Sequence, residues 1–281
     1  MLPSSFSMRS RFLRFTGAAC ALGAGLWADA SAAEHSWANP VPHGELRSLS
    51  TDRPDATESP FTVDAGHVQI EASVAAYSRV DAATTEWNVA PVNVRVGLRS
   101  DFELQFLFAG YLHARTAATG TAAAITRAGF GDVTLRAKYN CWGNNGGVSA
   151  FGLLPFLKLP TNSGGVGNRS LEGGLILPVS FSFGVWSVSA MTEIEWVRNS
   201  LDDGYAPAWT NSLSIGRELS RKLAAFAELA STAGEGGHVF GFNCGLTYAV
   251  HADLQLDCGA NFGLSRAAPD VTVFCGVAVR Y

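Results

Sequence analysis

Charged and amide side chains recur at alternate positions in several stretches of this sequence. Such pairs are Gln69 and Glu71, Glu103 and Gln105, Arg136 and Lys138, and Glu193 and Glu195. Residues two apart in an extended strand point to the same side, so each pair would lie on one polar face. Carboxylates and cations on such faces can pair across neighbouring strands, or they can line a water-filled interior that solutes cross.

The residues with the spacing to line that interior carry both signs of charge. The candidates are Glu71, Arg95, Glu103, Arg136, Lys138, Lys158, Glu193, Glu195, Asp257 and Arg280, with Gln69, Arg99, Gln105, His113, Glu172, Glu228 and Asn261 on the same faces. Because acidic and basic side chains are mixed, no preference for anions or cations follows. Most of them are expected to pair with one another and to solvate the wall.

The sequence contains no pattern of residues typical of catalysis, metal binding or a cofactor. There is no Gly-x-Ser-x-Gly elbow and no Cys-x-x-Cys pair, and the six His are scattered. The glycines of residues 163–167 lack the lysine and the strand-to-helix context of a phosphate-binding loop. We therefore predict that the protein is not an enzyme and has no catalytic residue, no metal site and no cofactor.

Alternation of apolar and polar residues predicts the strands that carry these side chains. Examples are VNVRVGL at 92–98 and LQLDCGANF at 254–262. Twelve such stretches lie near 67–78, 87–98, 102–114, 130–140, 148–159, 172–183, 186–197, 206–216, 223–231, 239–250, 254–263 and 271–281. Most are longer than the roughly 5 to 6 residues usual in soluble sheets. Tilted strands of about 9 to 11 residues can cross a bilayer.

The connections between the predicted strands alternate in length. Short turns lie at 99–101, 143–147, 184–185, 217–222 and 251–253, and longer loops lie near 79–86, 115–129, 160–171, 198–205, 232–238 and 264–270. Bacterial outer-membrane barrels have an even number of strands, short periplasmic turns and longer outer loops. The pattern predicts an all-β fold: a transmembrane, antiparallel, up-and-down β-barrel of about 12 strands over residues 64–281. Both termini would be periplasmic.

The beginning of the chain is typical of an export signal. Arg9, Arg11 and Arg14 precede an apolar stretch at 15–28, and small residues follow it. We predict a signal peptide at residues 1–33 and a mature protein in the outer membrane.

Composition excludes other classes of protein. After the first 30 or so residues there is no apolar run of about 18 residues, which a membrane-spanning helix requires. The net charge of −4 gives no basic surface for nucleic acid. A soluble secreted β-sandwich remains as an alternative.

The last predicted strand indicates which face would meet lipid. Val273, Cys275, Val277, Val279 and Tyr281 share one face, whereas Gly276, Ala278 and Arg280 share the other. Lipid accepts the first set and a wet lumen accepts the second. Four tryptophans near strand ends are expected at the membrane interfaces, with ordinary core aromatics as the alternative: Trp87, Trp186, Trp196 and Trp209.

Several short motifs resemble one known family. They are Thr51-Asp52-Arg53-Pro54-Asp55, Ala90-Pro91-Val92-Asn93, Gly129-Phe130-Gly131-Asp132 and Ala267-Ala268-Pro269-Asp270. Together they resemble the "MetA-pathway of phenol degradation" family of Gram-negative outer-membrane proteins over about residues 48–281. This chain departs from the family in its four cysteines after the predicted signal. The resemblance implies a β-barrel with a role in uptake, and it supplies no catalytic residue and no specific substrate.

The C-terminus resembles the signal that the barrel-assembly machinery reads. Residues 276–281 begin with Gly276, alternate in polarity and end with the aromatic Tyr281. Phe274 stands where a polar residue is usual. The alternative is an ordinary strand that ends in tyrosine.

Residues 34–63 precede the first predicted strand. Pro40, Pro42, Pro54 and Pro60 disfavour a helix or a long strand there. Asp52, Arg53 and Asp55 supply charges that can reach lumen residues. We expect this segment to enter the barrel as a plug or constriction, and a loose periplasmic tail is the alternative.

These features predict a channel for the passive uptake of small, aromatic or apolar molecules. Its expected partners are outer-membrane lipid, the barrel-assembly machinery and an unidentified small solute. The alternatives are a barrel enzyme resembling the outer-membrane phospholipase, an adhesin, and a secreted sandwich that binds a ligand.

The cysteines after the signal fall on the apolar faces. They are Cys141, Cys244, Cys258 and Cys275. Cys244 and Cys258 flank the turn at 251–253 and would lie opposite one another or one diagonal apart. A bridge there would close a loop that the hairpin already closes, so we predict four free thiols.

Overall fold

The computed structural model describes residues 35–118, 123–199, 204–235 and 237–281. The predicted signal peptide therefore lies outside the described residues. One short 3₁₀ helix, η1 (His43–Glu45), precedes the strands. The strands are β1 (Val68–Arg79), β2 (Thr84–Val89), β3 (Val92–Arg99), β4 (Phe102–Phe108), β5 (Tyr111–Thr116), β6 (Ile125–Phe130), β7 (Val133–Trp142), β8 (Ser149–Leu159), β9 (Glu172–Phe183), β10 (Trp186–Arg198), β11 (Tyr205–Glu218), β12 (Leu223–Gly234), β13 (Gly237–His251), β14 (Leu254–Gly263) and β15 (Val271–Arg280).

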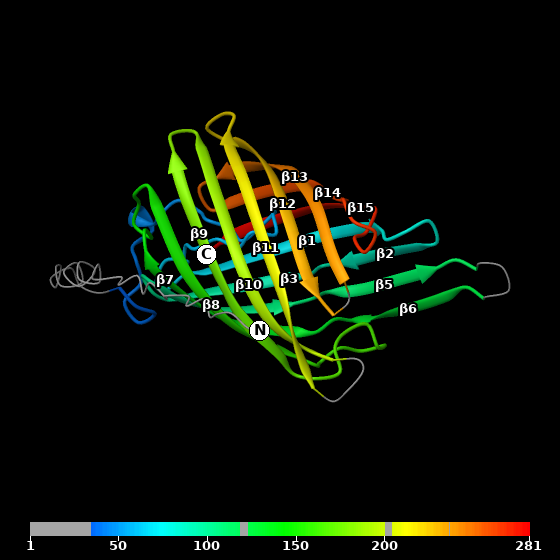
Figure 1. The fold of residues 1–281 in the computed structure, drawn as a ribbon. Coiled ribbons are helices and arrows are strands. Elements are labelled where there is room, and N and C mark those ends of the chain that lie inside the picture. Colours follow the sequence, from blue (N-terminus) through cyan, green and yellow to red (C-terminus); the bar gives the residue numbers. More distant parts are fainter. Residues whose placement is uncertain (1–34, 119–122, 200–203, 236) are drawn as a thin grey trace, which may run out of the picture. The chain divides into compact units, whose positions relative to one another are not determined.

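The strands form one antiparallel sheet that closes on itself (Figure 1). Neighbours in sequence pair from β7 to β15, and β15 then pairs with β1 to complete the ring. β1 pairs with β3 in its first half and with β2 in its second half, so β2 and β3 are two parts of one interrupted strand. The same holds for β4 with β5 and for β6 with β7. The barrel thus has the twelve strands that the sequence predicts.

The three interruptions occur where the backbone cannot continue a regular ladder. Pro91 lacks an N–H, and Ala90 before it has a φ of 53°. Gly110 has a φ of 77°, and a third break lies at residues 131–132. The break at Gly110 changes which side chains face the lumen. His113, predicted to face the lumen, instead pairs with the outward-facing Trp87 and is itself exposed.

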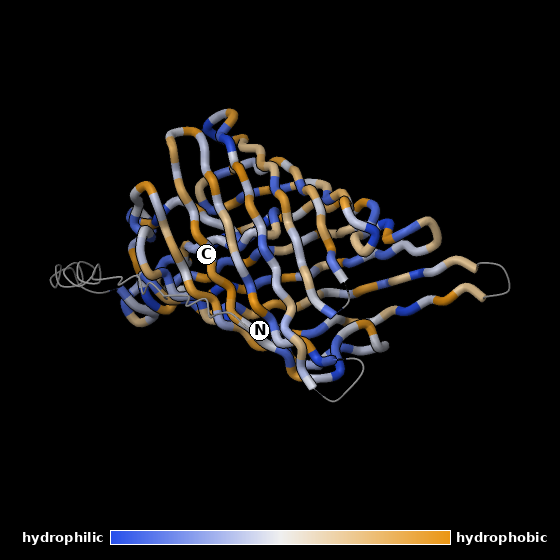
Figure 2. Tube along the Cα trace, in the orientation of Figure 1, coloured by the Kyte–Doolittle hydropathy of each residue, from blue (hydrophilic) through white to orange (hydrophobic). Residues whose placement is uncertain are grey.

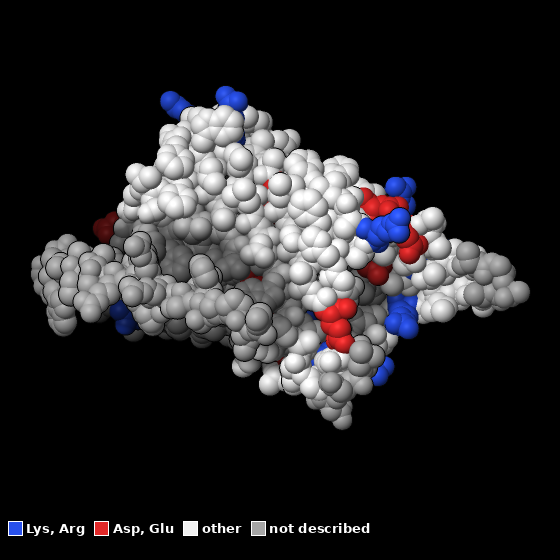
Figure 3. Space-filling model, in the orientation of Figure 1, with Lys and Arg blue, Asp and Glu red and all other residues white. Residues whose placement is uncertain are grey.

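The outer surface of the barrel is apolar, as the alternation predicts. Figure 2 shows hydrophobic and hydrophilic positions alternating along the strands. In Figure 3 the charged side chains gather towards the two ends of the barrel and leave an uncharged band between them. On β15 the predicted lipid face is exposed at Val273 and Cys275, whereas Ala278 and Arg280 are buried. Trp87, Trp186, Trp196 and Trp209 are 45–49% exposed, which ordinary core aromatics would not be.

The turns are short at one end of the barrel and the loops are mostly longer at the other. Two predicted loops are largely strand in the structure. Residues 115–129 are mostly a β-hairpin, in which β5 and β6 pair from Tyr111–Phe130 to Thr116–Ile125. The predicted loop at 232–238 mostly belongs to β12 and β13, which pair as far as Gly234–Gly237. The hairpin of β5 and β6 projects beyond its neighbours (Figure 1). Among the described residues, no helix is long and apolar enough to cross a membrane.

Candidate functional site

The N-terminal segment, residues 35–67, begins against the ends of the strands, where Ser36 bridges to Arg99 of β3. Its stretch from Ser50 to Ala65 runs inside the barrel and contacts lumen-facing side chains of β1, β3, β4, β7, β12 and β14. Those side chains are among the most buried of the protein, since Arg95, Glu103 and Lys138 have no exposed surface. Charged residues of this kind stay buried only when they are paired.

Asp52 is the centre of the first group of contacts. Its carboxylate lies 2.6 Å from Nζ of Lys138 and 3.4 Å from Arg95, and it accepts a hydrogen bond of 2.8 Å from the amide of Gln105. Burial alone would raise the pKa of Asp52, but Arg95 and Lys138 outweigh it and lower this pKa from 3.8 to about 2. Asp52 is therefore a charged anchor.

Two wall carboxylates complete this group. Arg95 lies 2.8 Å from Glu71 and 3.0 Å from Glu103. Glu71 also accepts the backbone N–H of Asp52 at 3.0 Å, and Glu103 accepts that of Val63 at 2.5 Å. The wall thus holds both the side chain and the backbone of the N-terminal segment.

Arg53 makes the second group of contacts. Its guanidinium donates to both carboxylate oxygens of Asp257, at 2.7 and 3.2 Å, and to the hydroxyl of Ser73. It also lies over the ring of Phe274, 5.9 Å from the centroid. Gly276 leaves room for this side chain, because a Cβ there would collide with the guanidinium and with the carbonyl oxygen of Ala72.

The tip of the segment, residues 55–58, crosses to the opposite wall. Glu228 on β12 accepts the backbone N–H groups of Ala56 and Thr57 at 2.9 and 2.7 Å, together with the hydroxyl of Thr57 and the amide of Asn243. The hydroxyl of Thr57 is also 2.7 Å from that of Ser212 on β11. These contacts fasten the tip to β11 and β12.

Asp55 lies beside this contact and forms no salt bridge with a cation of the described part of the chain. Burial, followed by the nearby charge of Glu228, raises the pKa of Asp55 from 3.8 to about 7, and a hydrogen bond with Ser214 opposes the shift. The tip therefore places the titratable carboxyl of Asp55 beside the carboxylate of Glu228, which already accepts four hydrogen bonds.

Glu58 joins the tip to a third part of the wall. Its carboxylate pairs with Arg136, and its backbone N–H donates to the sulfur of Met191 at 3.4 Å. Met191 belongs to an apolar cluster inside the barrel with Leu154, Phe156 and Ile176. Burial raises the pKa of Glu58 despite the opposing charge of Arg136.

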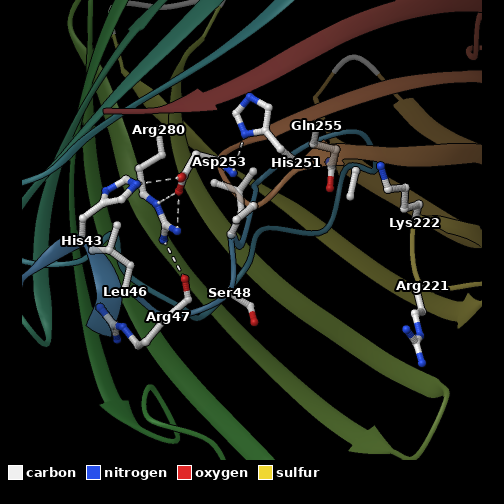
Figure 4. A pocket seen from close by; sticks show the side chains of 13 residues that line it. His43, Leu46, Arg47, Ser48, Arg221, Lys222, His251, Asp253, Gln255 and Arg280 are labelled. Atoms are coloured by element: carbon white, nitrogen blue, oxygen red, sulfur yellow. Dashed lines mark hydrogen bonds and ion pairs between the residues drawn. The ribbon is translucent and has the colours of Figure 1, made fainter.

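The base of the segment is fixed at the end with the short turns. Arg280 lies 3.1 Å from Asp64 and 2.7 Å from Asp253, and Arg47 lies 2.6 Å from Asp64. Figure 4 shows Arg280 between Asp253 and the backbone oxygen of Arg47. A cavity of about 630 Å³ opens beside these residues and is lined further by Lys222 and His251.

The structure unites most of the site residues that the sequence predicts. Asp52, Glu71, Arg95, Glu103 and Lys138 form one cluster, Arg53 pairs with Asp257, Arg136 with Glu58 and Arg280 with Asp64. Lys158 lies apart from these and is 3.8 Å from Glu172. Glu193 and Glu195 face the lumen from β10 and make no salt bridge with any described residue.

Sequence reasoning missed four charged members of the site. Glu58 lies three residues after Asp55 and could have been included on that ground. Arg47, Asp64 and Asp253 lie outside every motif, and only the fold brings them to Arg280.

One row of lumen-facing side chains crosses the part of the wall that β10 to β15 form. Its members are direct cross-strand partners on β10 to β15: Ser189, Ser214, Glu228, Asn243, Asn261 and Thr272. We call this set the polar row. A cavity of about 310 Å³ lies between Ser189, Ser214 and Asp55, and another of about 140 Å³ lies beside Asn243, Asn261 and Thr272. Glu228, which holds the tip, lies between the members that line these two cavities.

A comparison with known protein families identifies the family of this chain. The model of the family "Putative MetA-pathway of phenol degradation" matches residues 51–281. The chain belongs to this family. No curated protein matches the sequence.

Solved structures with a similar fold are outer-membrane barrels. The NanC porin has 8% sequence identity, covers 75% of this chain and 98% of its own, and superposes with a TM-score of 0.52. The KdgM porin has 12% identity over 76% of this chain and 98% of its own, with a TM-score of 0.47. The CymD monoaromatic hydrocarbon channel has 9% identity over 76% and 87%, with a TM-score of 0.43. At 8% identity the likeness to the NanC porin concerns the fold alone.

Proposed function

We propose that this protein is a passive channel of the outer membrane for small, aromatic or apolar molecules, and that its N-terminal segment is a plug within the lumen. The carrying observation is the set of buried ion pairs between residues 52–64 and the inner wall, beside cavities that remain open along β10 to β15. A loose periplasmic tail would not form buried ion pairs with the inner wall. A barrel of twelve strands is wider than side chains alone can fill.

The membrane partners follow from the same architecture. The apolar outer band suits outer-membrane lipid. We assign recognition by the barrel-assembly machinery to residues 276–281, which end β15 at the closing seam. In this arrangement the short turns and both termini are periplasmic.

The plug can be tested by locking it. Thr57→Cys and Ser212→Cys, with Cys141, Cys244, Cys258 and Cys275 replaced by Ser, put two thiols where the two hydroxyl oxygens are now 2.7 Å apart. In planar bilayers the oxidised protein should conduct little, and a reductant should raise the conductance. Deletion of residues 52–55 should raise it permanently.

Two controls belong to this experiment. The single variant Thr57→Cys should not respond to oxidant, and heat-modifiable migration on a gel should show that every variant folds. If the locked, the reduced and the deleted proteins conduct alike, the segment is not a plug.

A second function is favoured by one pair of residues on the outside of the barrel. The hydroxyl of Ser231 lies 2.9 Å from Nε2 of His238, at the end with the long loops. A hydroxyl beside an imidazole is the minimum that a nucleophilic hydrolase needs. Labelling with a fluorophosphonate probe, abolished by Ser231→Ala, would support a lipid-facing hydrolase, and absence of labelling would oppose it.

A further inference from the structure

The polar row climbs from one end of the barrel to the other. Ser189 is three residues from Trp186, which follows the short turn after β9. Thr272 is the second residue of β15, directly after the loop at 264–270. Strands of a barrel are tilted, so a row of direct cross-strand partners rises along the wall. The row therefore joins the two mouths along one side of the lumen.

The cavities follow this row and the tip interrupts it. Ser189 and Ser214 line the cavity of about 310 Å³, and Asn243, Asn261 and Thr272 line the cavity of about 140 Å³. Between them Glu228 holds the tip. Gln255 lines both the 310 Å³ cavity and the 630 Å³ cavity at the end with the short turns, so these two spaces are adjacent.

The polar row offers hydroxyl and amide groups and almost no free charge. Glu228 is its single ionisable member, and four donors already occupy that carboxylate. The amide of Asn261 makes no hydrogen bond with any described residue, so both its donor and its acceptor are available to a solute. The buried lumen cations Arg95 and Lys138 are paired with acidic side chains away from the row.

The smaller cavity limits the size of the solute. It measures about 140 Å³, and an apolar protein cavity of about 150 Å³ accommodates benzene. Gly241 and Gly263 contribute no side chains to its wall, and Ala268 of the loop at 264–270 also lines it. One six-membered ring matches the volume of this space.

We infer that the polar row is the permeation path and that the cavity at Asn261 is a binding subsite for an uncharged, single-ring molecule that carries hydroxyl groups. The inference rests on the proposed channel function and deepens it. The amide of Asn261 would donate to and accept from the ring substituents. None of the six side chains of the polar row is positively charged, so the row offers an organic anion no charge that replaces its hydration shell.

Liposome swelling tests the path with solutes that do not cross lipid unaided. The probes are myo-inositol as the uncharged ring, quinate as its anionic counterpart and sucrose as a two-ring solute. Wild-type protein should admit myo-inositol faster than the other two. Asn261→Leu and Thr272→Val should each slow myo-inositol by about three- to tenfold, the effect of one or two lost hydrogen bonds.

Asn93→Leu is the matched control, because Asn93 sits on β3, away from the polar row. It should leave the entry of myo-inositol unchanged, and heat-modifiable migration should be normal for all three variants. If Asn261→Leu has no effect, or if Asn93→Leu has the same effect, the proposed permeation path is contradicted and the proposed channel function is not. If quinate enters as fast as myo-inositol, the solute class is wrong. If even the barrel lacking residues 52–55 admits no solute and carries no current, the proposed channel function itself fails.

Discussion

Arg53 in the N-terminal segment and Asp257 in β14 form a bidentate ion pair across 204 residues of sequence. The side chain of Asp257 has no exposed surface and that of Arg53 is 18% exposed, so each depends on the other. Removing one member of a buried pair typically costs about 3 to 5 kcal/mol.

The first prediction concerns this pair. Asp257→Asn should weaken docking of the segment and raise single-channel conductance, and Arg53→Gln should do the same. The two substitutions together should have less effect than the sum of both, because they remove one shared interaction. Fully additive effects in bilayer recordings would show that the pair does not hold the segment.

The second prediction is a pH dependence set by Asp55. Its pKa is 3.8 when it is free and about 7 when it is docked beside Glu228 and Ser214, with Glu58 also nearby. The docked form thus keeps a proton that the free form loses. Stabilisation of docking is complete below 3.8 and is lost as pH rises through about 7. Conductance should increase between pH 5 and pH 8.

Substitution separates Asp55 from other titrating groups. Asp55→Asn should conduct little at every pH, whereas Asp81→Asn in an exposed loop should keep the wild-type profile. An unchanged profile in Asp55→Asn would assign the pH dependence to another group.

The third prediction concerns the cysteines. Cys244 lies opposite Ala260, so its relation to Cys258 is diagonal, whereas Cys258 lies directly opposite Cys275. Backbone hydrogen bonds join Arg280 to Asp253 and Gly263 to Asp270 in the same ladder, which places the cysteine pair at a non-hydrogen-bonded position, the closer kind. The structure leaves all four thiols free.

Alkylation followed by mass spectrometry tests this register. Four modified cysteines are expected in the untreated protein. After oxidation with copper phenanthroline, a peptide that links Cys258 to Cys275 should appear, and Cys275→Ser should abolish it. A link between Cys244 and Cys258 would contradict the register.

The fourth prediction concerns topology. A single cysteine at Gly165, in the cysteine-free background, should react with a membrane-impermeant maleimide on intact cells because the loop between β8 and β9 is expected outside. A cysteine at Asn145, in the short turn after β7, should react only after the outer membrane is opened. The reverse result would invert the orientation.

Alternation of polarity in the sequence was sufficient to predict the barrel. A period of two identifies both the strands and their faces, which is why Cys275 and Arg280 were assigned to the correct sides. His113 was assigned to the wrong side because the backbone at Gly110 leaves the extended conformation, and the alternation restarts beyond it. The alternation of polarity by itself does not show where such a shift in the inward-facing positions occurs.

The candidate site was only partly predictable for a different reason. The sequence shows that Asp52, Arg95 and Lys138 carry complementary charges, but the partner of each depends on strand tilt and register. Glu58 and Asp64 find their cations through the path of an irregular segment, which no periodicity describes.

Arg53 touches Ser73 on β1 and Asp257 on β14, on either side of β15, which closes the barrel against β1. Its binding place therefore does not exist in a chain whose first and last strands have not yet met. The N-terminal segment can complete its docking only after closure, so the Arg53 contact forms at the final step of assembly. Resistance of residues 35–63 to an added protease would then report finished barrels, and stalled intermediates would be trimmed at that segment.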